Sequence, residues 1–154
     1  MLKKVLSFIF LLFPLLCIAQ TYKYIGVENG LSNRQVYAIQ KDKKGYMWFL
    51  THDGIDRFNG KDFKPYKLMD GEEEVSSILN LNWLCIDKKG TLWEIGKQGR
   101  VFRYDDVHDT FQLVYKLPKS AFAKEIHSPV SYGFVDGNCV VWLCTSDLIY
   151  LFHS

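Results

Sequence analysis

The chain has 154 residues, of which 48% are hydrophobic and 16% aromatic, and it carries 19 lysines and arginines against 17 aspartates and glutamates. These values are typical of a globular protein and exclude disordered and collagen-like chains, and the length suits one ordinary domain at most. Two of the basic residues lie in a leader that we expect to be removed. The remaining chain is close to neutral, so nucleic-acid binding is not expected.

The leader, residues 1–19, has the pattern of a secretory signal peptide. Lys3 and Lys4 precede an apolar run over residues 5–16, and small residues follow at the positions that a signal peptidase reads. We predict cleavage between Ala19 and Gln20 and export to the periplasm. A lipoprotein signal and an uncleaved anchor are the alternatives, although the apolar run is shorter than the roughly 20 residues of a membrane span.

A motif recurs three times after the leader, at spacings of 45 and 49 residues. Each copy places an aspartate six residues before a tryptophan, and the first two copies share the sequence DKKG before it. The recurring residues are Asp42, Gly45 and Trp48, then Asp87, Gly90 and Trp93, and finally Asp136 and Trp142. Because catalysis needs one site and not three, we assign the aspartates to turns and the tryptophans to packing between repeats.

The first copy has the pattern of a β-meander. Alternating residues rich in β-formers, separated by turn sequences such as Asn59-Gly60, predict strands at residues 36–40, 46–50, 55–58 and 62–66. Pro65 indicates that the last strand lies at an outer edge, where a missing N–H is tolerated. We therefore expect a first strand plus a propeller blade over residues 20–66.

The second copy follows the same plan over residues 81–117, with strands predicted at 83–87, 91–95, 100–104 and 110–115. We interpret residues 67–80 as a loop between blades, in which residues 69–77, with the acidic run Glu72–Glu74, are solvated and do not form a metal site. Residues 118–129 are predicted to form a second loop, and residues 130–154 a partial third blade. The sequence thus predicts an all-β fold of propeller-type blades, each a four-stranded antiparallel meander, with about two and a half to three blades in an incomplete ring.

At this point the sequence resembles a known family. The segment Gly30-Leu31-Ser32-Asn33, followed by Val36, Asp42, Gly45, Trp48, Thr51, Gly54 and Phe58, is similar to the two-component regulator propeller repeat. The resemblance extends over residues 22–66, 81–115 and, more loosely, 130–152. It departs at Leu50, Cys139 and Leu148, where the family usually has glycine.

In that family, tandem blades form the periplasmic sensor of hybrid two-component proteins that regulate glycan use in Gram-negative bacteria. The resemblance implies that an oligosaccharide is the ligand and that the chain is an N-terminal fragment of a sensor. Kinase and output domains, and any membrane attachment, would belong to a longer parent protein. The expected partners are further propeller blades or another copy of the chain.

Two other functions stay open, namely a free-standing exported binding module and an exported propeller enzyme that acts on glycans. No motif for hydrolysis, nucleotide binding or metal binding occurs, so we expect no cofactor, no metal and no enzyme activity in these residues. The candidates for ligand binding are Tyr46, His52, Trp83 and Tyr132. His52 has a competing interpretation as a residue that stabilises a turn.

Overall fold

The computed structural model describes residues 22–77, 80–118, 130–145 and 148–153. The predicted signal peptide at residues 1–19 and its cleavage site lie outside the described residues. The same is true of most of the predicted loop at 118–129.

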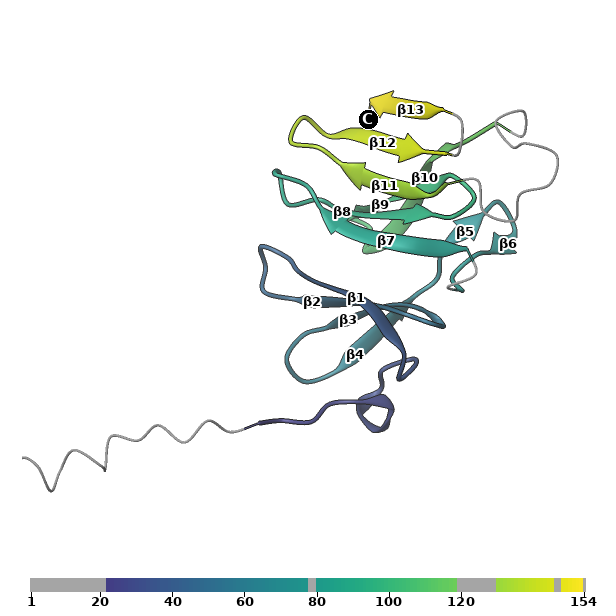
Figure 1. Ribbon diagram of the computed structural model, residues 1–154. Helices are drawn as coiled ribbons and strands as arrows, with labels where there is room; N and C mark the ends of the chain where they lie inside the picture. Colours follow the sequence, from purple (N-terminus) through teal and green to yellow (C-terminus); the bar gives the residue numbers. More distant parts are fainter. Residues whose placement is uncertain (1–21, 78–79, 119–129, 146–147, 154) are drawn as a thin grey trace, which may run out of the picture.

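Three antiparallel sheets, each built from consecutive strands, make up most of the described chain (Figure 1). The first contains β1 (Val36–Lys41), β2 (Met47–Thr51), β3 (Gly54–Phe58) and β4 (Phe63–Tyr66). The second contains β7 (Leu81–Ile86), β8 (Leu92–Gly96), β9 (Arg100–Asp105) and β10 (Thr110–Lys116). The third contains β11 (Tyr132–Val135), β12 (Val140–Cys144) and β13 (Ile149–His153). A short 3₁₀ turn, η2 (Val27–Asn29), precedes the first sheet.

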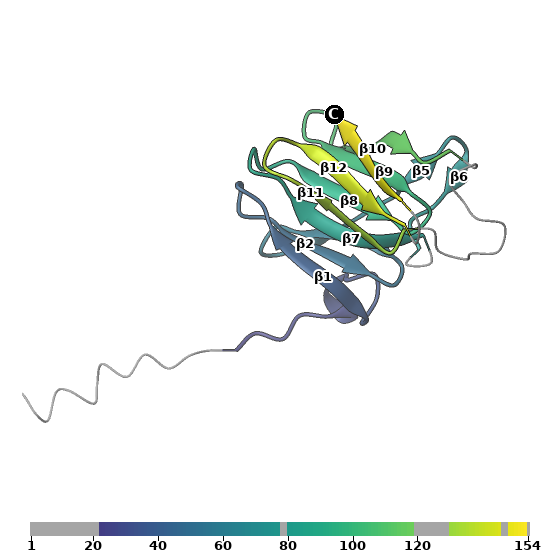
Figure 2. The ribbon, with the colours of Figure 1, turned by 45° about the horizontal axis from the view of Figure 1, so that its top comes forward.

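The sheets stack face to face, and their first strands β1, β7 and β11 lie next to one another (Figure 2). Each sheet is a meander, so its last strand lies at the edge opposite to its first. Pro65 lies in β4, an edge strand, where proline is compatible with a sheet. The predicted all-β fold of propeller-type blades is confirmed, and the three sheets do not close into a ring.

Two apolar layers hold the stack together. The layer between the first and second sheets is centred on Trp48, Leu50, Ile55, Leu84 and Phe102. The layer between the second and third sheets is centred on Trp93, Ile95, Val101, Val141 and Leu143. Burial of apolar area between stacked sheets is therefore the main stabilising contribution in this arrangement.

The tryptophans of the repeat contribute to these layers to different extents. Trp48 has no exposed surface and makes edge-on contacts with Tyr104 and Phe111 of the second sheet, at centroid distances of 4.7 and 6.0 Å. Trp93 is buried against the third sheet. Trp142 is half-buried and stacks on Phe134 of its own sheet, with the ring planes 9° apart.

Residues 67–80, predicted to be a loop between blades, contain a hairpin of β5 (Met69–Asp70) and β6 (Glu73–Glu74). The prediction that residues 69–77 are solvated is wrong at Val75 and Ser76, which are buried, whereas residues 71–74 are exposed. The hairpin is also tied to the second sheet, since Asp70 Oδ2 accepts a hydrogen bond of 2.6 Å from Arg100 Nε. Its charged residues therefore cover an ordered connection between the two sheets.

Candidate functional site

The turn after the first strand of each sheet is held by its aspartate. Asp42, Asp87 and Asp136 accept hydrogen bonds from the indole Nε1 of Trp48, Trp93 and Trp142, at 2.8, 3.0 and 3.0 Å. The second carboxylate oxygen accepts a backbone N–H four residues after each aspartate, at 2.9, 2.9 and 3.0 Å. In each repeat one carboxylate thus joins the turn to the following strand, and its acceptors are occupied by the protein itself.

The fourth residue of each turn has a left-handed backbone. Gly45 and Gly90 have φ of 90°, and Cys139, which stands at the same place in the third turn, has φ of 62°. Cys139 is buried, and its Sγ lies 3.3 Å from Asp87 Oδ2 of the preceding turn. The third repeat therefore keeps the turn geometry with a strained residue where the first two use glycine.

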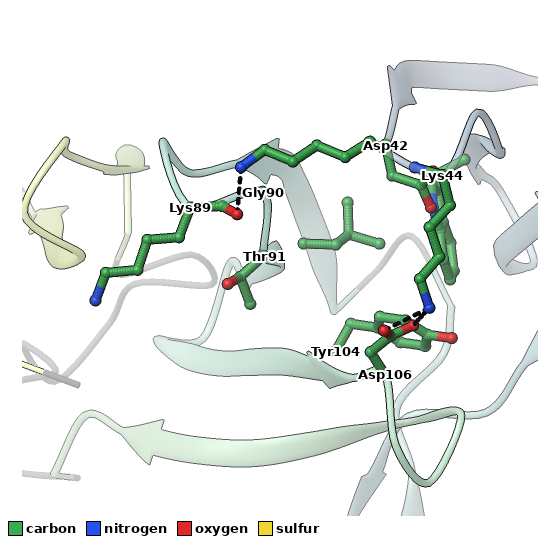
Figure 3. Close-up of a pocket in the computed structure, with 10 residues that line it drawn as sticks. Asp42, Lys44, Lys89, Gly90, Thr91, Tyr104 and Asp106 are labelled. Atoms are coloured by element: carbon green, nitrogen blue, oxygen red, sulfur yellow. Dashed lines mark hydrogen bonds and ion pairs between the residues drawn. The ribbon is translucent and has the colours of Figure 1, made fainter.

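A cleft of about 290 Å³ opens between the first and second sheets at this end of the strands (Figure 3). Its walls come from the first two DKKG turns and from the turn that joins β9 to β10. The lining residues are Asp42, Lys43, Lys44, Trp48, Lys89, Gly90, Thr91, Leu92, Tyr104 and Asp106. The volume is near the lower limit of small-molecule pockets in proteins.

Lys43 spans the cleft from the first turn to the second. Its ammonium donates to the backbone carbonyls of Lys88 and Lys89, at 3.3 and 2.5 Å. Its aliphatic stem lies directly over Gly90, where an added Cβ would be 2.6 Å from Lys43 Cδ. The glycine is therefore needed for the close approach of this side chain as well as for the turn.

Lys44, which follows Lys43 in the first turn, pairs instead with Asp106 in the β9–β10 turn (Figure 3). The Nζ of Lys44 is 2.7 and 2.5 Å from the two carboxylate oxygens, and the hydrogen bond to Asp106 raises the pKa of the lysine. Both side chains are more than half exposed. Exposed pairs of this kind contribute little to stability, so the pair is easily opened by a competing ion.

A polar cluster behind the cleft fixes the two sheets relative to each other. The carboxylate of Asp109, after the β9–β10 turn, accepts hydrogen bonds from Arg57, Lys64 and Tyr66 of the first sheet and from Tyr104 of the second. Burial alone would raise the pKa of Asp109, but the hydrogen bonds from Lys64 and the two tyrosines hold it well below its usual range. This cluster thus joins the wall residue Tyr104 to the first sheet.

The four predicted ligand-binding residues do not form one site. Tyr46 is half-buried with the Arg57 guanidinium 4.6 Å from its ring centroid, and it does not line the cleft. His52 is exposed on the β2–β3 turn, at the opposite end of the sheet, where its Nδ1 is 3.0 Å from Asp53. Trp83 and Tyr132 lie together in an edge-on contact at 6.2 Å.

The sequence interpretation missed the charged residues of the cleft. Lys43, Lys44 and Lys89 belong to the repeated DKKG motif, which we read only as a turn, and Asp106 belongs to no repeated motif. The two adjacent lysines of the first turn were the available signal for the cleft. They line a cleft only because the second turn lies beside the first in space, and the local sequence does not specify that contact.

Two further searches concern metals and membranes. Among the described residues, no three His, Cys, Asp or Glu side chains are grouped as a metal site would require. Within the same residues there is no helix of the length and hydrophobicity needed to span a bilayer.

Comparison with known proteins relates the chain to bacterial sensors. The family model for the two-component regulator propeller matches residues 30–53. Over 50 residues, or 32% of this chain, the sequence is 40% identical to Histidine kinase P4 of Formosa agariphila. This stretch corresponds to only 4% of that protein.

Two solved structures from B. thetaiotaomicron are similar over most of the chain. The extracellular domain of BT3049, a protein described as a hybrid two-component system, is 25% identical with a TM-score of 0.61, over 84% of this chain and 18% of that one. The extracellular domain of BT4673 is 21% identical with a TM-score of 0.64, over 87% of this chain and 18% of that one. The chain therefore spans less than a fifth of the extracellular domains that it resembles.

Proposed function

Since the chain belongs to the two-component regulator propeller family, we propose that it is the periplasmic ligand-sensing segment of a two-component regulator that responds to an oligosaccharide. The observation that carries the proposal is the match of the family model to residues 30–53 together with a fold shared with a sensor's extracellular domain over 84% of the chain. Kinase and output functions lie in other parts of the regulator.

Two features support a periplasmic location. The structural relatives are extracellular domains. Residues 1–19 have the charge and hydrophobicity pattern of a signal peptide, with cleavage proposed between Ala19 and Gln20.

The ligand site in this proposal is the cleft between the first two sheets. Its walls belong to different sheets, so a bound sugar contacts both sheets. The sugar therefore favours the relative arrangement of the two sheets in which these contacts are best. The cleft also combines an apolar surface, from Leu92 and Tyr104, with charged groups at its rim, as small-molecule sites commonly do. A shift between arrangements of the blades is the signal that would pass to the output domains.

The third sheet provides a surface for a protein partner. Tyr132, Phe134, Ile149 and Leu151 lie on the face turned away from the second sheet and are 55, 39, 62 and 52% exposed. The equivalent faces of the first and second sheets are covered by the following sheet. We propose a further propeller blade as the occupant, and a second copy of the chain as the competing outcome of an ultracentrifugation measurement.

A thermal-shift screen of the purified protein against a panel of plant, algal and host oligosaccharides tests the sensing proposal. A ligand that binds only the folded state at 100 times its Kd stabilises it by about 2.7 kcal/mol. At least one oligosaccharide is expected to raise Tm in a saturable manner without being consumed. The absence of any such sugar contradicts the proposal, and turnover of the sugar would select an exported enzyme instead.

A further inference from the structure

We infer that the cleft between the first two sheets selects an anionic sugar, with its carboxylate or sulfate group held by Lys43 and Lys44. The inference rests on the proposed sensing function and adds the chemical class of the ligand. It follows from the balance between occupied and available polar groups around the cleft.

The acidic groups of the cleft are already engaged by the protein. Asp42 accepts the backbone N–H groups of Lys44 and Tyr46 on one oxygen and the indole N–H of Trp48 on the other. Asp106 pairs only with Lys44 among the described residues. Asp42 therefore has little capacity left to accept hydrogen bonds from a ligand, and both oxygens of Asp106 already contact Lys44.

The lysines, in contrast, can supply further donors. An ammonium has three N–H groups, and Lys43 uses two of them on the carbonyls of Lys88 and Lys89. Lys44 is held by one carboxylate in a pair whose two side chains are 58 and 55% exposed. The Lys44 ammonium contacts the two oxygens of Asp106, so a third N–H remains for a ligand carboxylate or sulfate, as it does at Lys43.

The neutral part of the ligand has a surface to contact. Leu92 and Tyr104 contribute apolar surface to the cleft, and Thr91 adds a hydroxyl to its wall. The volume of about 290 Å³ is near the lower limit for small-molecule pockets, so the cleft suits one terminal sugar residue and not a long chain. An acidic monosaccharide unit at the end of an oligosaccharide fits both the size and the charge.

The second repeat provides a matched control residue. Lys88 occupies the position of Lys43 in the second DKKG turn and extends over Gly137 of the third turn, outside the cleft. A substitution of Lys88 changes the same charge in the same kind of turn.

The test uses the purified protein in NMR titrations with three probes that share one ring: D-glucuronate, D-glucose 6-sulfate and D-glucose. We expect either anionic sugar to bind at least about tenfold more tightly than glucose, since a hydrogen bond to a charged group commonly contributes this much. Lys44→Gln and Lys43→Met should each weaken glucuronate binding about tenfold. Lys88→Met should change it by less than about twofold, and thermal melts verify that every variant is folded.

Several outcomes overturn the inference. Equal affinity for glucose and glucuronate would mean that the cleft does not select charge, while the proposed sensing of an oligosaccharide would still stand. Equal losses in Lys43→Met and Lys88→Met would mean that the anion binds elsewhere or by general attraction. If inorganic sulfate binds as tightly as glucose 6-sulfate, the sugar ring contributes nothing to binding and the cleft is an anion site only. The oligosaccharide screen then tests the proposed sensing function separately.

Discussion

Glu94 is the most informative residue for testing how the first two sheets pack. It lies in the middle of β8 between Leu84 and Phe102 on the neighbouring strands, and it has no exposed surface. The backbone N–H of Asn82 donates to Oε1 at 3.2 Å, whereas Oε2 has no hydrogen-bond partner among the described residues. Burial raises the pKa of Glu94 well above its usual value and so favours the neutral form of this side chain in the folded protein.

The substitution Glu94→Gln converts this property into a measurable pH dependence. Above pH 4.5 the unfolded chain loses the Glu94 proton while the folded chain keeps it, so the free energy of unfolding falls as pH rises. The loss is about 1.4 kcal/mol per pH unit for one proton, or about 2.7 kcal/mol between pH 5 and pH 7 while the folded side chain stays protonated. Glutamine has nearly the shape of the protonated acid and does not titrate, so the variant lacks this contribution.

Urea unfolding of both proteins at pH 5, 6, 7 and 8 measures the difference directly. The variant and the parent should have similar stability at pH 5, and the variant should become progressively more stable above it. Glu72→Gln, in the exposed part of the acidic run, serves as the control and should show no such trend. A stability difference that stays constant from pH 5 to pH 8 would refute the reasoning, because it would mean that Glu94 is ionised in the folded protein.

Three further substitutions test the turns and the contacts between sheets, each by urea unfolding at pH 7. In Asp109→Asn the new residue also tolerates the φ of 52°, but the negative charge that Arg57 contacts is lost. We therefore expect the free energy of unfolding to fall by about 2–3 kcal/mol. Since the pKa of Asp109 is depressed, this loss should shrink as pH falls below about 4; a loss as large at pH 3 as at pH 7 would contradict it. Gly45→Ala should cost about 1–2 kcal/mol through φ alone, because no atom lies within 4 Å of the added Cβ. Gly133→Ala should cost about 1–3 kcal/mol, because its Cβ would lie 2.7 Å from Ile95 Cγ2 across the sheets, and an unchanged midpoint would show that the third sheet is loosely packed.

The parts of the fold that depend on local chemistry were predictable from the sequence. The spacing of six residues between Asp42 and Trp48 is short enough for one carboxylate to bind both the turn and the indole, so the motif itself specifies the geometry. The alternation of residues and the turn sequences then gave the strand order within each sheet. The repeat of the motif gave the number of sheets.

The candidate site was not predictable in the same way because it depends on contacts between repeats. The ammonium of Lys43 binds carbonyls 45 and 46 residues further along the chain, and Lys44 binds a residue 62 positions away. Nothing in the first turn specifies which turn will lie beside it. The hairpin β5–β6 was missed for a related reason, since its buried residues Leu68 and Val75 are separated by the charged residues that dominate the sequence there.

The comparison of equivalent positions shows which residues serve the fold and which are available for binding. Glu94 stands where the other two repeats have Phe49 and Leu143, so an acid has replaced an apolar residue at a buried position. The acid there accepts one hydrogen bond, from the backbone N–H of Asn82, and its second oxygen has no hydrogen-bond partner among the described residues.

The third turn supports the same distinction. Gly137 replaces the lysine found at the second position of the first two turns, and the space left by the missing side chain is filled by Lys88 from the turn before. The sequence shows only that a lysine is lost, whereas the structure shows that the loss makes room for another. Because the aspartate and tryptophan are kept in all three turns while the lysines are not, the geometry of the turn depends on the aspartate and tryptophan and not on the lysines.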